Sequence, residues 1–380
     1  MRGIMKGKRI KIGEVIPGMK LAAPILDYLG RELIKGGVVL KDNLIVKLKV
    51  RGVPEVLIMT EEGEPEEEKK KKVDRLEVLF KQTHNKAIEC TRRVMQNLET
   101  GGTPDEEEEV KNVVKEMVSR AISSQNILTN LVYLKSYDNY LYTHSVNTCA
   151  LSLIIGIYLD YSRERLFELG VGSLLHDLGM TKVPRELYDH PGAVTTEQFE
   201  AIKKHTLYGR NLIKQMKEIS SSAIAVAYQH HERADGSGYP RGITNLQIHQ
   251  FARIVAVSDV YEALISARRY RRERIPAEAM RTVLGEGNLF DSRVVRAFLG
   301  HMSIYPVRSV VVLNNEEIGL VIGTRRNFPF RPQIKVIFDS EGNRLESAKL
   351  IDLSESEYTS LYIAKTIDEK TLDLDLSEEL

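Results

Sequence analysis

The chain has 380 residues, of which 42% are hydrophobic and 28% charged, and its formal net charge is +1. This length allows two or three domains, and the small net charge excludes bulk attraction to nucleic acids or membrane surfaces. Cys90 and Cys149 are the only cysteines, which argues against a disulfide framework and favours a cytoplasmic protein. Because no apolar run has transmembrane length and the N-terminus is Lys-rich, we expect neither a membrane span nor a signal peptide.

Residues 1–60 are expected to form a small β-rich module. Residues 9–12 alternate charged and apolar side chains, and apolar runs at 38–40 and 56–59 predict further strands, with a short helix at 44–50. Residues 61–72 are a block of acids followed by lysines, which indicates a solvated linker or a helix start. Apolar residues at helical spacing then predict long helices over 73–98 and 106–135, which could form a homodimer contact.

Residues 136–305 are almost entirely helical in pattern and predict a compact α-helical domain. The helical segments are expected near 140–158, 163–177, 196–217, 220–231, 246–267 and 276–299. Residues 306–380 predict a β-rich C-terminal region, with strands near 309–313, 319–323, 334–338 and 361–364. The fold class is therefore mainly α, with a β-rich module before the helical domain and a β-rich tail after it.

The helical domain carries a pair of polar residues, His176 and Asp177, inside the apolar run at 174–179. A buried Asp is costly unless it is paired or bound to a metal. One His on an apolar face is more often a satisfied core residue, and a single Asp is often a helix cap. Further imidazoles and a carboxylate nevertheless occur in the same domain, at His144, His205, His230, His231 and Asp259.

Several imidazoles and carboxylates on different helices are how helical bundles build metal sites. A His/Asp set without cysteine favours iron, manganese or zinc, and more than four ligands suggest two adjacent ions. Paired ions hold the attacking and leaving oxygens of a phosphoryl displacement. The remaining histidines lack this setting and are expected to be surface or structural residues: His84, His190, His249 and His301.

Two further stretches have the chemistry of a nucleotide site. Residues 235–240 form a glycine-rich turn that presents Tyr239, although composition alone would favour an ordinary loop. Residues 268–272 are Arg-Arg-Tyr-Arg-Arg, and guanidinium groups bind phosphate in a bidentate manner and stack on bases. A solvated helix end is the common alternative for such an arginine run.

The His-Asp pair, the string from His230 to Pro240, Asp259 and residues 268–271 together resemble the HD-GYP family of HD-type metal phosphohydrolases, over roughly residues 130–305. The resemblance implies an enzyme that hydrolyses cyclic di-GMP to pGpG and GMP. It implies that two divalent metal ions, iron or manganese, are held by His144, His176, Asp177, His205, His230, His231 and Asp259, with Asp177 bridging them. It also implies that the substrate is held by Asp235, Tyr239, Arg268 and Arg271.

Two positions depart from the family pattern. Tyr140 stands where some members carry a Glu for a third metal, so two metals are expected here. Met180 stands where many members carry Lys, and Lys182 is the nearest replacement for a catalytic role. The sequence therefore leaves two alternatives open: a catalytically silent cyclic-dinucleotide sensor, and a phosphohydrolase for another nucleotide. No nucleic-acid polymer is expected among the partners.

Overall fold

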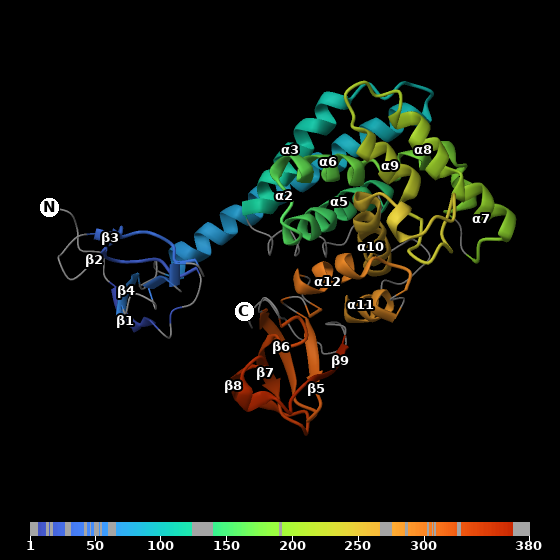
Figure 1. Ribbon diagram of the computed structural model, residues 1–380. Coiled ribbons are helices and arrows are strands. Elements are labelled where there is room, and N and C mark those ends of the chain that lie inside the picture. The colour runs from blue at the N-terminus through green and yellow to red at the C-terminus, as the bar shows by residue number, and fades with distance from the viewer. Residues whose placement is uncertain are drawn as a thin grey trace. The chain divides into compact units, whose positions relative to one another are not determined.

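The computed structural model describes residues 7–12, 15, 18–26, 32–41, 44–45, 47–48, 53, 55–59, 66–123, 140–189, 192–266, 276–285, 288–301, 304–305, 307, 309–324 and 328–367. The chain divides into two compact units, Met1–Glu77 and Val78–Leu380, and each is described by itself (Figure 1).

The first unit contains two small antiparallel β-ladders. Strand β1 (Gly7–Lys11) pairs with β4 (Glu55–Met59), and β2 (Ile25–Leu26) pairs with β3 (Glu32–Ile34). The apolar run at 56–59 predicts β4, and within this strand Val56 and Ile58 are buried while Glu55 is exposed. Strands β2 and β3 were not predicted, because elements of two and three residues are too short to show a period. Val39 forms only an isolated bridge with Lys20.

Helix α2 (Glu66–Glu99) starts inside the charged block and continues through both units. The apolar residues Phe80, Ala87, Val94 and Leu98 are buried. They are seven, seven and four positions apart, which places them on one helix face. Helix α3 (Glu107–Ser123) follows and packs against α5 and α6, described next. Most described apolar positions of the two helices are thus buried within one chain, whereas Val78 and Ile122 are exposed. Dimerisation stays a prediction. Residues 124–135 of the predicted second helix lie outside the described residues.

The helical domain is built around α5 (Tyr140–Tyr158), which packs against α6 (Arg163–Leu174), α10 (Gln250–Ile265) and α12 (Ser292–His301). Residues 143–156 of α5 are all buried, polar side chains such as His144 and Asn147 included, so α5 is the central helix of the domain. Helix α9 (Ser221–Gln229) packs on α6, on α10 and on α8 (His205–Ile213). These helices match the predicted segments near 140–158, 163–177, 220–231 and 246–267.

Two predicted helices are each divided in the structure. The segment near 196–217 forms α7 (Thr196–Lys203) and α8, with Lys204 between them. The segment near 276–299 forms α11 (Pro276–Gly285) and α12. Asp291 accepts a hydrogen bond from the backbone N–H of Arg293 and so begins α12 afresh. Short 3₁₀ helices connect the rest: η2 (Leu178–Lys182), η3 (Arg185–Leu187) and η4 (Asn245–Gln247).

The C-terminal region forms one five-stranded antiparallel sheet with the strand order β8-β7-β6-β5-β9. Its strands are β5 (Val310–Leu313), β6 (Ile318–Gly323), β7 (Gln333–Phe338), β8 (Arg344–Asp352) and β9 (Ile363–Ile367), with η5 (Ser356–Tyr358) before β9. Strand β8 was missed because it is an edge strand whose side chains are mostly exposed, including Leu350. Within the described part of the chain, no helix is both long and apolar enough to cross a membrane.

Candidate metal centre

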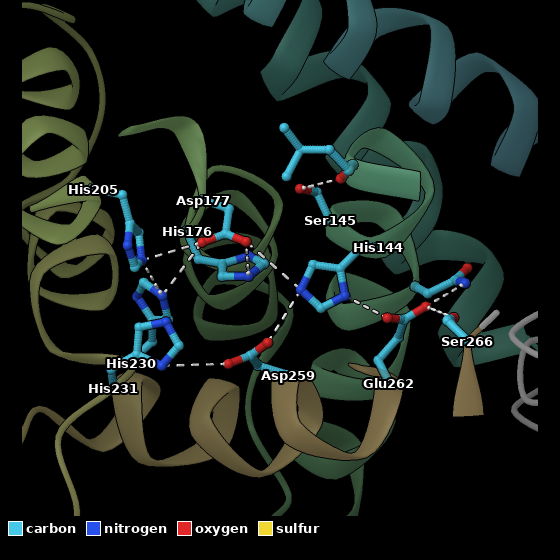
Figure 2. Close-up of polar contacts among 12 residues, drawn as sticks. His144, Ser145, His176, Asp177, His205, His230, His231, Asp259, Glu262 and Ser266 are labelled. Atoms are coloured by element: carbon cyan, nitrogen blue, oxygen red, sulfur yellow. Dashed lines mark hydrogen bonds and ion pairs between the residues drawn. The ribbon is translucent and has the colours of Figure 1, made fainter. Parts of the chain in front are cut away.

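The predicted ligands come from five places in the helical domain and point toward one another (Figure 2). His144 is the fifth residue of α5, and Asp259 lies inside α10 rather than at a cap. His176 and Asp177 follow the end of α6, just before η2. His205 is the first residue of α8, and His230 and His231 follow α9. Helix termini dominate because a side chain there can leave the helix surface and reach a shared point.

Asp177 lies at the centre of the cluster. Its Oδ1 atom is 3.4 Å from His205 Nε2 and 3.5 Å from His230 Nε2. Its Oδ2 atom is 3.5 Å from His176 Nε2 and 3.7 Å from His144 Nε2. Each carboxylate oxygen therefore faces a different pair of imidazoles, which is the geometry of a carboxylate that lies between two cations.

Asp259 joins the two ends of the cluster. Its Oδ1 atom is 3.1 Å from His144 Nε2, and its Oδ2 atom is 3.8 Å from His231 Nδ1. The ligand atoms fall into two groups, each with all members within 4.8 Å of one another. One group consists of Asp177, His205, His230 and His231, and the other consists of His144, His176 and Asp259.

Backbone carbonyls fix the orientation of three imidazoles. The Nδ1 atom of His176 lies 2.8 Å from the carbonyl oxygen of Ser173, and that of His205 lies 2.7 Å from the carbonyl oxygen of Ile202. His230 Nδ1 is likewise 3.1 Å from the carbonyl oxygen of Val226. A carbonyl oxygen only accepts, so each Nδ1 carries the hydrogen and each Nε2 directs a lone pair into the cluster.

The Nε2 lone pairs of these imidazoles are placed where they could bind a cation. His176 Nε2 is buried and has no hydrogen-bond partner among the described residues. His205 Nε2 and His230 Nε2 are 3.3 Å apart, and both are acceptors in the tautomers fixed above. Buried acceptors that face one another are unfavourable unless a cation or a proton lies between them. The residues therefore fit divalent metal ions.

Burial and neighbouring groups also shift the pKa values of the side chains in the cluster. Burial lowers the pKa of His176 to about 4, and it also lowers the pKa values of His205 and His231. Burial alone would raise the pKa of Asp177, but the adjacent imidazoles, His176 first, outweigh burial and hold it well below its usual value. His176, His205 and His231 are thus neutral imidazoles beside ionised carboxylates, which are the forms that bind metals. At His144, burial is outweighed by Tyr140, Glu262 and Asp259, which raise its pKa well above the usual value.

Glu262 is a functional residue that the sequence analysis missed. It is fully buried in α10, and its carboxylate accepts hydrogen bonds from His144 Nδ1 and from the hydroxyl of Ser266 (Figure 2). The amide of Asn147 donates a third bond, at 3.0 Å. A carboxylate behind a ligating His fixes its tautomer and raises its basicity. One signal was present, because Glu262 lies three residues after Asp259 in an apolar helix.

A glycine-rich loop places Tyr239 against the cluster. The buried carboxylate of Glu232 accepts from the backbone N–H groups of Arg241 and Ile243, at 2.8 and 3.1 Å. Gly238 is required in this loop, since a Cβ there would be 2.3 Å from the backbone nitrogen of Arg233. The ring of Tyr239 stacks on His231, with centroids 4.7 Å apart and planes at 27°. Glu232 was also missed from sequence.

The other predicted site residues have different surroundings. The exposed Asp235 accepts from the backbone and hydroxyl of Ser237, within the turn itself. Lys182 Nζ donates to the carbonyl oxygen of Leu98 at the end of α2, at 2.7 Å. Met180 is buried in η2, and Tyr140 stacks on His144 with centroids 5.4 Å apart. Arg268 and Arg271 lie outside the described residues.

The histidines that were expected to be surface or structural also differ from one another. His84 is buried and lies 2.8 Å, through Nε2, from Asn147 Oδ1. His249 caps α10 by accepting from the backbone N–H of Phe251. The side chain of His301 and the whole of His190 lie outside the described residues.

Two parts of the chain match known protein families. Residues 126–294 match the HD domain, and residues 310–374 match a KOW domain associated with HD domains. The chain is 34% identical over 248 residues to the cyclic di-GMP phosphodiesterase PA4108 of Pseudomonas aeruginosa, a match that covers 65% of this chain and 60% of that protein. It is also 34% identical over 163 residues to the 3'3'-cGAMP-specific phosphodiesterase 1 of Vibrio cholerae, covering 43% of this chain and 36% of that protein.

Among solved structures, Bd1817, an HDG"Y"P protein from Bdellovibrio bacteriovorus, aligns over 78% of this chain and 95% of its own length, with a TM-score of 0.48 and 18% identity. The chain spans about three fifths of the Pseudomonas relative and about one third of the Vibrio relative.

Proposed function

We propose, from the match of residues 126–294 to the HD domain, that this chain is a metal-dependent phosphodiesterase that hydrolyses cyclic di-GMP to pGpG, GMP or both. The observation that carries the proposal is the cluster of five imidazoles and two carboxylates, which gathers into two adjacent ligand groups around Asp177. The relative from Pseudomonas aeruginosa, named for cyclic di-GMP hydrolysis, supports this choice of substrate.

The metal centre that we propose holds two divalent ions, iron or manganese, with Asp177 between them. Its imidazole and carboxylate donors suit these ions. When bound, the ions supply Lewis-acid activation of the phosphodiester and offset the charge that develops on its oxygens. Asp177 and Asp259 keep their charge in the buried cluster, and Glu262 keeps the His144 lone pair directed at it.

The nucleotide would lie against the wall formed by Tyr239. Phe199 of α7 meets this ring edge to face, with centroids 6.0 Å apart, and is 44% exposed. The ammonium group of Lys203 lies 5.4 Å from the centroid of the Tyr239 ring. Exposed aromatic faces stack on bases, and a neighbouring cation attracts phosphate. Asp235, Arg268 and Arg271 remain proposed substrate contacts.

We assign Lys182 to structure rather than catalysis, because the carbonyl oxygen of Leu98 engages its ammonium group. Met180 cannot donate a proton or bind phosphate in its place. These two observations favour one alternative, a catalytically silent sensor that binds cyclic dinucleotides and signals through the rest of the chain. The Vibrio relative specific for 3'3'-cGAMP motivates the other alternative, a different cyclic dinucleotide.

The test is a product analysis on protein purified without oxygen. Bound iron and manganese are measured, cyclic di-GMP or 3'3'-cGAMP is added, and the products are separated over time. We expect pGpG or GMP from cyclic di-GMP, at a rate that rises with metal content toward two ions per chain. Binding without product at full metal loading would identify a sensor. Faster turnover of 3'3'-cGAMP than of cyclic di-GMP would make 3'3'-cGAMP the substrate instead.

A matched pair of variants makes the test specific. Asp177→Asn keeps the shape of the side chain but removes its charge, so metal content and turnover should both fall by at least about 100-fold. Asp189→Asn, which alters only a partly exposed pair with Arg185, should leave both unchanged. Undiminished turnover in the Asp177→Asn protein would contradict the proposed centre. The cytoplasm is the compartment we propose, in keeping with the two free buried thiols Cys90 and Cys149.

A further inference from the structure

A row of buried polar side chains continues from the metal cluster to helix α2. His144 Nδ1 donates to Glu262 Oε2, and Asn147 Nδ2 donates to Glu262 Oε1 at 3.0 Å. Asn147 Oδ1 lies 2.8 Å from His84 Nε2. The four residues come from three helices, since His144 and Asn147 share α5, Glu262 belongs to α10 and His84 belongs to α2.

The chemistry of the side chains determines which group donates and which accepts in each of these hydrogen bonds. The ionised carboxylate of Glu262 can only accept, so the NH₂ group of Asn147 faces it. The carbonyl oxygen of Asn147 therefore faces His84, and His84 Nε2 must carry a hydrogen. His84, Asn147 and Glu262 have 6, 1 and 0% exposure, so bulk water is in no position to replace a missing donor.

We propose that His84 is a positioning residue of the metal centre, acting through Asn147 and Glu262 on His144. The inference rests on the proposed metal site. Without the His84 donor, the buried Asn147 carbonyl loses its partner, and only Glu262 still holds the amide. The amide can then shift toward another donor and give up its hydrogen bond to Glu262, so that carboxylate is held less firmly against His144 Nδ1 and the imidazole no longer directs Nε2 at the cluster.

The effect should be confined to one of the two ligand groups. His144 belongs to the group with His176 and Asp259, whereas the group around His205 contains neither His144 nor a hydrogen bond to Glu262. Removal of the His84 donor should therefore weaken one metal position and spare the other. A general packing defect would weaken both.

Three variants of α2 test the inference. His84→Met removes the donor at similar volume, and His84→Gln keeps an N–H near the position of Nε2. Thr91→Val is the matched control: Thr91 is buried on the same helix, and its hydroxyl donates only to the carbonyl oxygen of Ala87 in that helix. Metal-free proteins are titrated with Mn²⁺ by calorimetry, and the ions that remain per chain are counted after dialysis against a chelator.

We expect two Mn²⁺ sites in the wild type, in His84→Gln and in Thr91→Val. In His84→Met, one site should weaken by about 10-fold or more while the other keeps its affinity. Wild-type affinity at both sites of His84→Met, equal weakening of both, or failure of His84→Gln to rescue would each overturn the inference. Failure of the wild type to bind two ions would instead count against the metal centre itself. Should His84→Met not fold, His84→Leu, which also lacks a donor, takes its place.

Discussion

Gly179 lies directly against the backbone of His205: a Cβ on Gly179 would be 1.9 Å from the His205 carbonyl oxygen and 2.4 Å from the Gly209 nitrogen. This close approach lets η2, which follows Asp177, pack on α8, whose first residue is the ligand His205. The missing side chain of Gly179 thus sets the separation between Asp177 and His205, two of the proposed metal ligands on different segments.

Gly179→Ala should therefore damage the metal centre without changing a ligand. Both clashing atoms belong to backbone and cannot rotate away, so α8 must move and carry His205 from Asp177. We expect a loss of about 1–3 kcal/mol in the free energy of unfolding, typical of overpacking, with weaker metal binding. Denaturant unfolding and metal analysis measure the two effects. Gly285→Ala, where nothing lies within 4 Å of the added methyl, should change neither, and an unaffected Gly179→Ala protein would refute the argument.

Tyr239 should contribute to substrate binding rather than to metal binding. Loss of a stacking ring costs about 1–3 kcal/mol per base, so Tyr239→Leu should raise KM by roughly 5- to 150-fold. Tyr239→Phe keeps the ring and should stay within a few-fold of the wild type. Steady-state kinetics with cyclic di-GMP give KM, and metal content is measured on the same samples. Tyr362→Leu, an exposed residue of the C-terminal region, is the control. Loss of bound metal in Tyr239→Leu would show that the ring has a structural role instead.

Lys182 should prove dispensable for turnover. Its ammonium group donates to the Leu98 carbonyl oxygen and so ties η2 to the end of α2. Lys182→Met removes a hydrogen bond from a charged donor, which we expect to lower the free energy of unfolding by about 1.5–3 kcal/mol. The folded, metal-loaded variant should turn over substrate at a rate within about threefold of the wild type. If turnover at full metal loading were instead slowed by two orders of magnitude, Lys182 would return to a catalytic role.

His84 should make stability depend on pH below about 6.5. Burial lowers its pKa in the folded protein, and this outweighs the opposing effects of the Asn147 hydrogen bond and the Glu262 charge. The unfolded chain takes up a proton near pH 6.5 while the folded chain does not, so the free energy of unfolding falls as pH falls through this window. One group contributes at most about 1.4 kcal/mol per pH unit.

The measurement compares denaturant unfolding of the wild type and His84→Gln from pH 7.5 to 5. Other titrating groups are common to both proteins, so the difference between the two curves isolates His84. The wild type should lose more stability than the variant below pH 6.5 and match its slope above. Parallel curves over the whole range would contradict a neutral, buried His84.

The seven residues that the structure brings together in the cluster could be named from sequence because their residue types are conspicuous in apolar helices and match a family string, and their role as metal ligands stays a proposal. The residues that hold them could not. His84 and Asn147 are 63 positions apart, and Asn147 and Glu262 are 115 apart, so no local pattern connects them. The same holds for the fold: periodicity predicts α5 and α10, but it continues across the break at Lys204, and it is absent from the exposed edge strand β8.

The lone pairs of His205 Nε2 and His230 Nε2 face each other, and this contact affects the stability of the metal-free protein in a cell. Without a cation between them, the folded chain retains an unfavourable contact that unfolding relieves. Each bound ion at about 100 times its Kd adds about 2.7 kcal/mol to stability, and two such ions approach the whole net stability of a small domain. Chains synthesised when metal is scarce would therefore be degraded faster than metal-loaded chains, and the abundance of the protein would follow the metal supply.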